Sequence, residues 1–239
     1  MPSSFKIGIN IYKDKKKATI SSNNIDSTDA KEYLEKGSAM VKSMPIDEYS
    51  GLADKKDYAC EIEDLELEDT TQLSEKQLLD QALLAEDAML KNKKITNSEG
   101  ATRSFSKNTY NIINSRGFNA KYSKTFHSIS SIAIAGSDTN MQRDYEYSAA
   151  THASDLLLAE KVGSLAAKRA ASRLNSKKIK SCTLDVIFEP RVAKSILSSF
   201  CSCASGTSIA RGTSFLNNQL NTSIFKKNIN ITNNPKLKR

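Results

Sequence analysis

A long run of alternating polar and apolar residues in the middle of the chain limits its fold more than any other feature. Residues 104–137 read SFSKNTYNIINSRGFNAKYSKTFHSISSIAIAGS, with β-branched and aromatic side chains in alternation. Such alternation is typical of strands, because successive side chains of a strand point to opposite faces. The residues Ser115-Arg116-Gly117 interrupt the run and read as a turn. We therefore expect antiparallel strands across Ala101–Ala149.

A shorter alternating segment near the N-terminus predicts a β-hairpin. Phe5–Tyr12 can pair with Ala18–Ser21 across a lysine-rich turn. Ser27 or Thr28 can cap a helix after this hairpin. The helix is expected to end before Pro45, because proline lacks the amide hydrogen that a helix interior needs.

Two further helices are predicted from capping and spacing. Ser74 and Gln77 have the spacing of a capping box, which opens a helix to about Lys91. Another helix is expected over Asp155–Leu174, with Asp155 in its first turn, where an acidic side chain suits the helix dipole. Its predicted buried stripe consists of Leu158, Val162, Leu165 and Ala166.

The last part of the chain is expected to contain a strand–helix unit. Thr183–Phe188 reads as a buried strand, and Pro190 suits the first position of a helix that ends near Gly206. Three apolar residues of that helix recur every four positions and are expected to face the core: Val192, Ile196 and Phe200. The sequence thus predicts an α+β fold, in which a β-hairpin and helices precede antiparallel strands and the strand–helix unit.

Three local features could indicate a metal site, but a structural role without metal is favoured for each. His127 lies in the strand region, where a lone histidine is more often a surface or packing residue than a ligand. Cys60–Asp69 carries six acidic residues, but it lacks the spacing and central glycine of a calcium loop, so a solvated loop is predicted. Cys201 and Cys203 would point about 200° apart on a helix, which disfavours joint ligation.

The charge of the chain raises the question of nucleic-acid binding, since the net charge is +8 and the pI is about 9.2. The basic residues are scattered, however, apart from the C-terminal ones and Lys13–Lys17, which read as the solvated hairpin turn. Nucleic acid is therefore not an expected partner. No run of about 18 apolar residues occurs, and the N-terminus lacks the apolar core of a signal peptide. We expect no membrane segment and a cytoplasmic location.

Two segments carry a family resemblance. They are Arg143–Leu174, RDYEYSAATHASDLLLAEKVGSLAAKRAASRL, and Val186–Leu216, VIFEPRVAKSILSSFCSCASGTSIARGTSFL. Both resemble the TldD/PmbA family of metallopeptidase proteins, and more narrowly its PmbA (TldE) branch. The resemblance implies an incomplete PmbA/TldD-like fold. Its N-terminal and central region would cover residues 1–185, and the start of a truncated C-terminal domain would cover residues 186–239.

The resemblance also implies where a zinc site would lie. The catalytic TldD branch carries the motif HExxxH on the helix that matches Arg191–Ser205, and its three functional positions correspond to Ser198, Ser199 and Cys203. Two serines and a cysteine offer neither the imidazole pair that holds zinc nor the glutamate that deprotonates zinc-bound water. No histidine follows His152. We expect no catalytic or metal-binding residue and no cofactor on this chain, and zinc on a TldD-like partner.

Three residues are candidates for a substrate surface. Tyr145 and Tyr147 would share one face of a strand and could line such a surface, although cross-strand packing is the ordinary role of such a pair. Arg211 could hold a peptide carboxylate or a backbone turn.

By resemblance, the expected function is that of a PmbA/TldE-like subunit of a TldD/TldE-type zinc metallopeptidase. The chain would have no activity of its own and would form a heterodimer with a TldD-like subunit, and the substrates would be unfolded or small peptides. Two alternatives stay open: a non-peptidase binding protein of the "modulator of DNA gyrase" type, and the non-functional remnant of a split gene.

Overall fold

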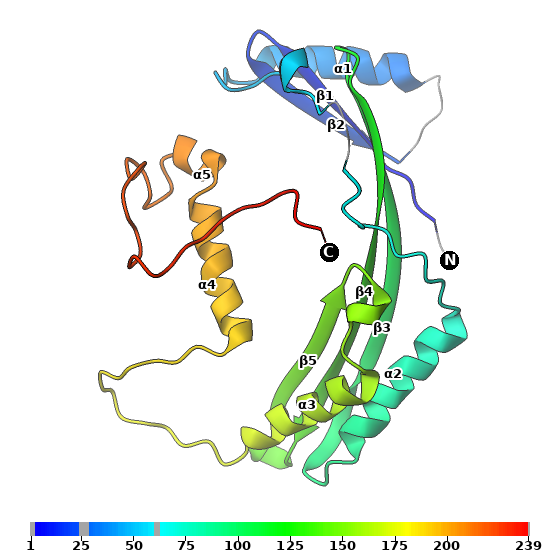
Figure 1. The fold of residues 1–239 in the computed structure, drawn as a ribbon, viewed down its shortest axis with the longest axis vertical. Coiled ribbons are helices and arrows are strands. Elements are labelled where there is room, and N and C mark those ends of the chain that lie inside the picture. The colour runs from blue at the N-terminus through cyan, green and yellow to red at the C-terminus, as the bar shows by residue number, and fades with distance from the viewer. Residues whose placement is uncertain (1–2, 24–28, 60–62, 239) are drawn as a thin grey trace. The chain divides into compact units, whose positions relative to one another are not determined.

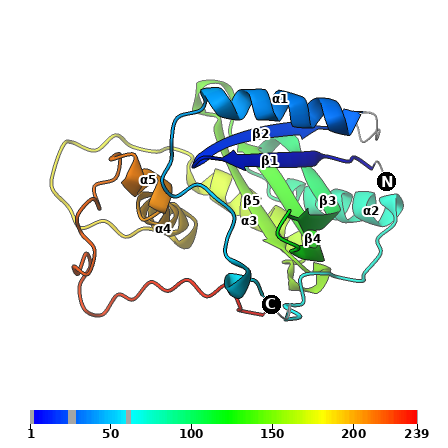
Figure 2. The same cartoon turned by 90° about the horizontal axis from the view of Figure 1, so that it is seen from above.

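The computed structural model describes residues 3–23, 29–59 and 63–238 and divides into two compact units. Unit 1 comprises Met1–Asp64 and Asn108–Ser123, and unit 2 comprises Leu65–Lys107 and Lys124–Arg239. In Figures 1 and 2 the elements are β1 (Ile7–Lys13), β2 (Lys16–Ser22), α1 (Asp29–Ser43), α2 (Glu75–Leu90), β3 (Ile95–Ile113), β4 (Asn119–Ala135), β5 (Gln142–Ala150), α3 (Ala159–Ser172), α4 (Pro190–Cys203) and α5 (Gly206–Ala210). Three short 3-10 turns are η1 (Lys55–Asp57), η2 (Asp138–Asn140) and η3 (Ala153–Asp155).

Unit 1 is built on the antiparallel hairpin of β1 and β2. Asp14 and Lys15 form its two-residue turn, and both have positive φ, 51° and 57°, as a type I′ turn requires. α1 packs closely on the hairpin, since a Cβ on Gly37 would lie 2.0 Å from an isoleucine side chain of β1. The predicted hairpin, lysine-rich turn and helix are confirmed. The two candidate helix caps lie outside the described residues: Ser27 and Thr28.

The tip of the β3–β4 hairpin belongs to the same unit. Its turn contains Gly117 at φ 93°, and the backbone N–H of Asn114 donates to the carbonyl of Phe118 at 3.0 Å. The Asn114 side chain donates to the Tyr58 hydroxyl at 2.9 Å, and the Tyr58 and Phe118 ring centroids lie 5.0 Å apart. Arg116 donates to the carbonyls of residues 52 and 53 at 3.1 and 2.9 Å. The predicted turn is confirmed, and it anchors the 52–58 segment.

Unit 2 contains an antiparallel sheet in the order β3–β4–β5, with α2 and α3 against one face (Figure 1). Alternate residues of β4 are buried on that side: Thr125, His127, Ile129, Ser131, Ala133 and Ala135. The core beneath the helices consists mostly of small side chains: Ala85, Ala133, Ala135, Ala166, Ala167 and Ala170, with Met89, Ile129 and Val162 among them. This mixture of helices and antiparallel sheet confirms the α+β class.

The capping box at the start of α2 is confirmed. The Ser74 hydroxyl accepts from the backbone N–H of Gln77 at 3.2 Å, and the Gln77 side chain accepts from the N–H of Ser74 at 2.8 Å. Two otherwise unpaired amides of the first turn are thereby satisfied.

α3 begins later than the sequence predicted. Asp155 lies in η3, where its N–H donates to the carbonyl of His152 at 3.2 Å, and the helix starts at Ala159. Leu158 is extended and 74% exposed, so its place in the buried stripe was wrong, whereas Val162 and Ala166 are fully buried as expected. The buried face of α3 consists mainly of alanine and glycine. Leu158 directly precedes the first helical residue, so it does not belong to that face.

The strand predicted at Thr183–Phe188 is not formed. That segment is extended and exposed, with Ile187 at 97%, because no neighbouring strand in the described part of the chain pairs with it. Pro190 does start α4, as predicted, but Val192 and Ile196 are 42% and 47% exposed instead of facing a core. Phe200 is half-buried, and its ring lies 5.0 Å edge-on from that of Phe225.

Close contact between α2 and α3 depends on the absence of a side chain at Gly163. A Cβ there would lie 1.8 Å from the carbonyl oxygen of Ala85, a backbone atom that cannot rotate away. We expect Gly163→Ala to lower the free energy of unfolding by about 1–3 kcal/mol, as overpacking does. Urea unfolding measures this. Gly206→Ala, where nothing lies within 4 Å of the new Cβ, should change stability by less than about 0.5 kcal/mol. Equal effects of both changes would contradict the assigned contact.

Candidate functional site

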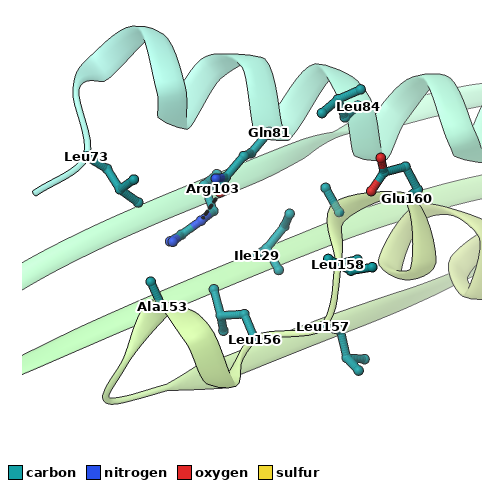
Figure 3. Close-up of a pocket in the computed structure, with 11 residues that line it drawn as sticks. Leu73, Gln81, Leu84, Arg103, Ile129, Ala153, Leu156, Leu157, Leu158 and Glu160 are labelled. Carbon is teal, nitrogen blue, oxygen red and sulfur yellow. Dashed lines mark hydrogen bonds between the residues drawn. The ribbon is translucent and has the colours of Figure 1, made fainter. Parts of the chain in front are cut away.

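A pocket of about 280 Å³ opens in unit 2 between α2, the β3–β4 sheet and the segment from η3 into α3 (Figure 3). Its lining is largely aliphatic and includes Leu73, Leu84, Ile129, Leu156, Leu157 and Leu158. Three polar residues complete it: Gln81, Arg103 and Glu160. In Figure 3, Arg103 lies at the end of the pocket near Leu73 and Ala153, and Glu160 lies at the opposite end.

Arg103 is 8% exposed and forms hydrogen bonds with neutral groups. Its Nε donates to Oε1 of Gln81 at 2.8 Å, and Nη1 donates to the carbonyls of Ser104 and Ser128. Its Nη2 lies 3.3 Å from Nδ1 of His127. Burial lowers the pKa of Arg103 from its usual range. Among the described residues, no carboxylate forms an ion pair with it.

His127 is fully buried behind Arg103. Because a guanidinium only donates, Nδ1 of His127 accepts from Arg103 and the ring proton resides on Nε2. Nε2 lies 3.2 Å from Oδ2 of Asp69 but without the alignment of a full hydrogen bond. Burial and the nearby Arg103 charge lower the pKa of His127, although the Asp69 carboxylate acts in the opposite direction. The imidazole is therefore neutral at physiological pH.

Asp69 ends this buried chain of polar groups. Its Oδ1 accepts from the N–H of Thr71 and its Oδ2 from the N–H of Ala153, both at 2.8 Å. Burial alone would raise its pKa, but these hydrogen bonds and the nearby His127 hold the pKa well below its usual range. The backbone N–H of Asp69 donates to Oγ1 of Thr125 at 2.8 Å. Asp69, His127 and Arg103 together join the 67–71 segment, the sheet and η3.

Sequence reasoning captured this cluster only in part. His127 is a packing residue, one of the two predicted roles, but its partnership with Asp69 and Arg103 was missed. Asp69 lies in an irregular segment as predicted, yet it is buried instead of solvated. The alternation that includes Ile129 and Ser131 already places His127 on the buried face of β4.

Ser198, Ser199 and Cys203 lie on α4. Ser199 Oγ donates to the carbonyl of Ser195 in its own helix at 2.9 Å. The carbonyl of Ser198 accepts from Ser202 Oγ at 2.9 Å, and that of Cys203 accepts from Ser214 Oγ at 2.7 Å. Their correspondence to a zinc motif stays a prediction.

Tyr145 and Tyr147 come together on β5, with ring centroids 6.3 Å apart and side chains 41% and 45% exposed. The Arg191 guanidinium lies 5.2 Å from the Tyr145 ring centroid. Arg211 lies at the end of α5, where its N–H donates to the carbonyl of Thr207. A role of these residues in substrate binding stays a prediction.

α4 is held to the sheet by a buried carboxylate. Arg191 Nη1 lies 2.9 Å from Oδ1 of Asp144 on β5, and Nη2 lies 3.2 Å from Oδ2. Arg173, the residue that follows α3, also donates to this carboxylate, at 3.2 Å. Burial opposes ionisation, but the hydrogen bonds from Arg191, Tyr145 N–H and Arg173 lower the pKa of Asp144 to about 2. The carboxylate therefore stays charged at neutral pH and anchors the first turn of α4.

Comparison with known proteins gives two matches along the chain. Residues 61–174 match the PmbA/TldA metallopeptidase central domain, and residues 181–239 match the PmbA/TldA metallopeptidase C-terminal domain. The chain is 32% identical to the Metalloprotease PmbA homolog of Haemophilus influenzae over 98% of its length, and 30% identical to Metalloprotease PmbA of Escherichia coli O157:H7 over 97%. These alignments cover 52% of each relative, so the chain spans about half the length of the curated relatives it matches.

The two domain matches place the chain among metallopeptidase-type proteins. More narrowly, it belongs to the PmbA/TldD family, and the curated relatives that it matches carry the name PmbA. The resemblance read from the sequence is confirmed. The proposed division at residues 185 and 186 stays a prediction.

Solved structures agree on the fold. A protein described as a modulator of DNA gyrase from Bacteroides thetaiotaomicron has a TM-score of 0.79 at 24% identity, covering 89% of this chain and 49% of that one. A second so described, from Thermotoga maritima, has a TM-score of 0.59 at 22% identity, covering 75% and 40%. At these identities the likeness concerns the fold alone. Within the described ranges, no helix combines the length and apolar character needed to cross a bilayer.

The buried neutral His127 makes stability depend on pH. In the unfolded chain its imidazole takes up a proton below about pH 6.5, whereas the lowered pKa in the folded state resists protonation. The contribution of His127 to the free energy of unfolding is therefore fully present above that pH. It declines as the pH falls toward the folded-state pKa, by at most about 1.4 kcal/mol per pH unit. We expect His127→Gln to flatten this decline between pH 7 and pH 5 in urea unfolding. If His152→Gln flattens it instead, the assignment to His127 is wrong.

The Arg191–Asp144 contact should govern local opening of α4. Arg191→Met removes charge-assisted hydrogen bonds worth about 1.5–3 kcal/mol, so amide hydrogen exchange in Pro190–Cys203 should accelerate roughly 10- to 100-fold. Exchange in α3 should change little. Lys194→Met on the same helix is the control, since Lys194 is exposed. Unchanged protection of α4 in the Arg191 variant would show that other contacts hold the helix.

Proposed function

We propose that this chain acts as a PmbA/TldE-like subunit of a TldD/TldE-type zinc metallopeptidase system and carries no metal of its own. The observation that supports this most is the family match over residues 61–174 and 181–239, combined with Ser198, Ser199 and Cys203 on α4. A zinc peptidase helix needs imidazole and carboxylate groups that face one ion. The matching positions hold two serines and a cysteine, which supply neither the imidazole pair nor the carboxylate, so these residues do not fit such a site.

In this proposal the chain supplies binding surface to the peptidase complex and no catalytic group. Arg191 of α4 binds Asp144 on β5 and so holds the helix to the sheet. The helix that carries the zinc motif in the catalytic branch has only this structural role in the present chain. The exposed Tyr145 and Tyr147 rings supply an aromatic surface on β5 that can contact an unfolded peptide. A TldD-like partner provides the zinc and the general base, and both subunits work in the cytoplasm.

The test is reconstitution with a TldD-like protein. The chain alone should hold no stoichiometric zinc by elemental analysis after mild chelation, and it should not cleave an unfolded peptide. It should copurify with the TldD-like protein, and the mixture should cleave the peptide in a chelator-sensitive manner. Tyr145→Ala should raise the KM of the mixture more than it lowers kcat, if that surface binds peptide without taking part in the chemistry.

Two results would overturn the proposal. The first is equimolar, tightly held zinc or chelator-sensitive cleavage by this chain alone. The second is a failure to bind the TldD-like protein together with a direct effect on supercoiling by purified DNA gyrase, which would favour the binding-protein alternative.

A further inference from the structure

The pocket of unit 2 contains a buried positive charge that forms no ion pair with a carboxylate in the described part of the chain. Arg103 is 8% exposed, and the groups that accept its hydrogen bonds are all uncharged: Gln81, Ser104, Ser128 and His127. Burying a cation is unfavourable unless an anion or several hydrogen bonds compensate it. The imidazole of His127 lies between Asp69 and the guanidinium, with Nε2 3.2 Å from Oδ2 of Asp69 and Nδ1 3.3 Å from Nη2 of Arg103.

Arg103, which lines the pocket, retains hydrogen-bonding capacity. A guanidinium has five N–H groups, and four hydrogen bonds leave Arg103: one from Nε, two from Nη1 and one from Nη2. One N–H of Nη2 is thus available to a ligand. The four hydrogen bonds of Arg103 restrain rotation of the guanidinium, so the donor is held in place before any ligand arrives.

The remainder of the pocket suits an aliphatic chain. Its volume of about 280 Å³ is near the lower end of ligand pockets, which favours a small molecule or the end of a chain. Ile129 forms part of the wall beside Arg103. In Figure 3, Leu156 lies near Ala153 at the Arg103 end, and Leu84 and Leu158 lie nearer to Glu160. Leu84, Leu157 and Leu158 are 45%, 36% and 74% exposed, so this side of the pocket leaves apolar surface in water.

We propose that this pocket binds an aliphatic carboxylate, with the carboxylate on Arg103 and the apolar chain along Ile129 toward Leu158. Glu160, at the opposite end, sets the orientation because a second carboxylate repels the anionic end of the ligand. The ligand is either a free medium-chain acid or the carboxyl terminus of an apolar peptide, since both present the same chemistry. The site is independent of the proposed subunit role, because it uses no residue of α4 and no partner.

The test is calorimetric titration of the full chain at pH 7 with octanoate, octanol and N-acetyl-Leu-Leu. Octanoate, the dipeptide or both should bind saturably, and octanol should bind at least about tenfold more weakly than the tighter carboxylate, because it cannot form the charge-assisted hydrogen bond. A preference of tenfold or more between octanoate and the dipeptide identifies the source. Absence of saturable binding by either carboxylate at millimolar concentration overturns the proposal, and so does equal affinity for octanol.

Neighbouring leucines on α2 offer a matched pair of variants. Leu84 lines the pocket and Leu83 does not, yet the two are 45% and 48% exposed, so a charge should be tolerated equally at both. Leu84→Glu should weaken carboxylate binding at least tenfold, whereas Leu83→Glu should leave it within twofold. Equal effects of the two changes would show that the ligand binds elsewhere. Arg103→Lys, if it folds, should lower affinity for the carboxylate but not for octanol.

Discussion

The fold of unit 2 depends on how closely two helices approach each other and the sheet beneath them. Gly163 brings α3 against the backbone of α2, and the residues between the helices and β4 are chiefly alanines. Alanine and glycine lose little side-chain entropy on burial, but each also buries little apolar area. Such a core gains stability from close packing more than from large side chains, so its tolerance for added volume is low.

This thin core explains why a chain of polar groups lies beside it. Where the helices diverge, near the start of α2 and at η3, alanines no longer fill the space. There Asp69 accepts from the backbone N–H groups of Thr71 and Ala153, and Arg103 donates to the carbonyls of Ser104 and Ser128. His127 lies between the two charged side chains and accepts from Arg103. An aliphatic side chain could fill the same volume but could not pair with those backbone groups, which would remain unsatisfied. The polar chain thus joins the pocket to the 67–71 segment without a continuous apolar core.

The elements that sequence predicted correctly are those fixed by local chemistry. The hairpin turn at Asp14 and Lys15, the capping box at Ser74 and the alternation of β4 each depend on residues close in the chain. Thr183–Phe188 has the composition of a strand, but a strand also needs a neighbour, which composition cannot supply. Arg103 gave no signal at all, because its significance comes from Gln81 and His127, each more than twenty positions away. Family resemblance identified the class of protein, yet it offered no indication of this pocket.

The two long strands of the central hairpin have a consequence for how the chain acquires its structure during synthesis. β3 and β4 carry the tip of the hairpin, Asn108–Ser123, into unit 1, while their other ends build the sheet of unit 2. The 52–58 segment is therefore translated well before Asn114 and Arg116, to which it is hydrogen-bonded. Unit 1 therefore cannot be completed when residues 1–64 have been synthesised, because it also needs the hairpin tip, residues 108–123. Contacts of this sequence separation slow folding, and the N-terminal part of unit 1 stays without its partner segment until residues 108–123 have been synthesised.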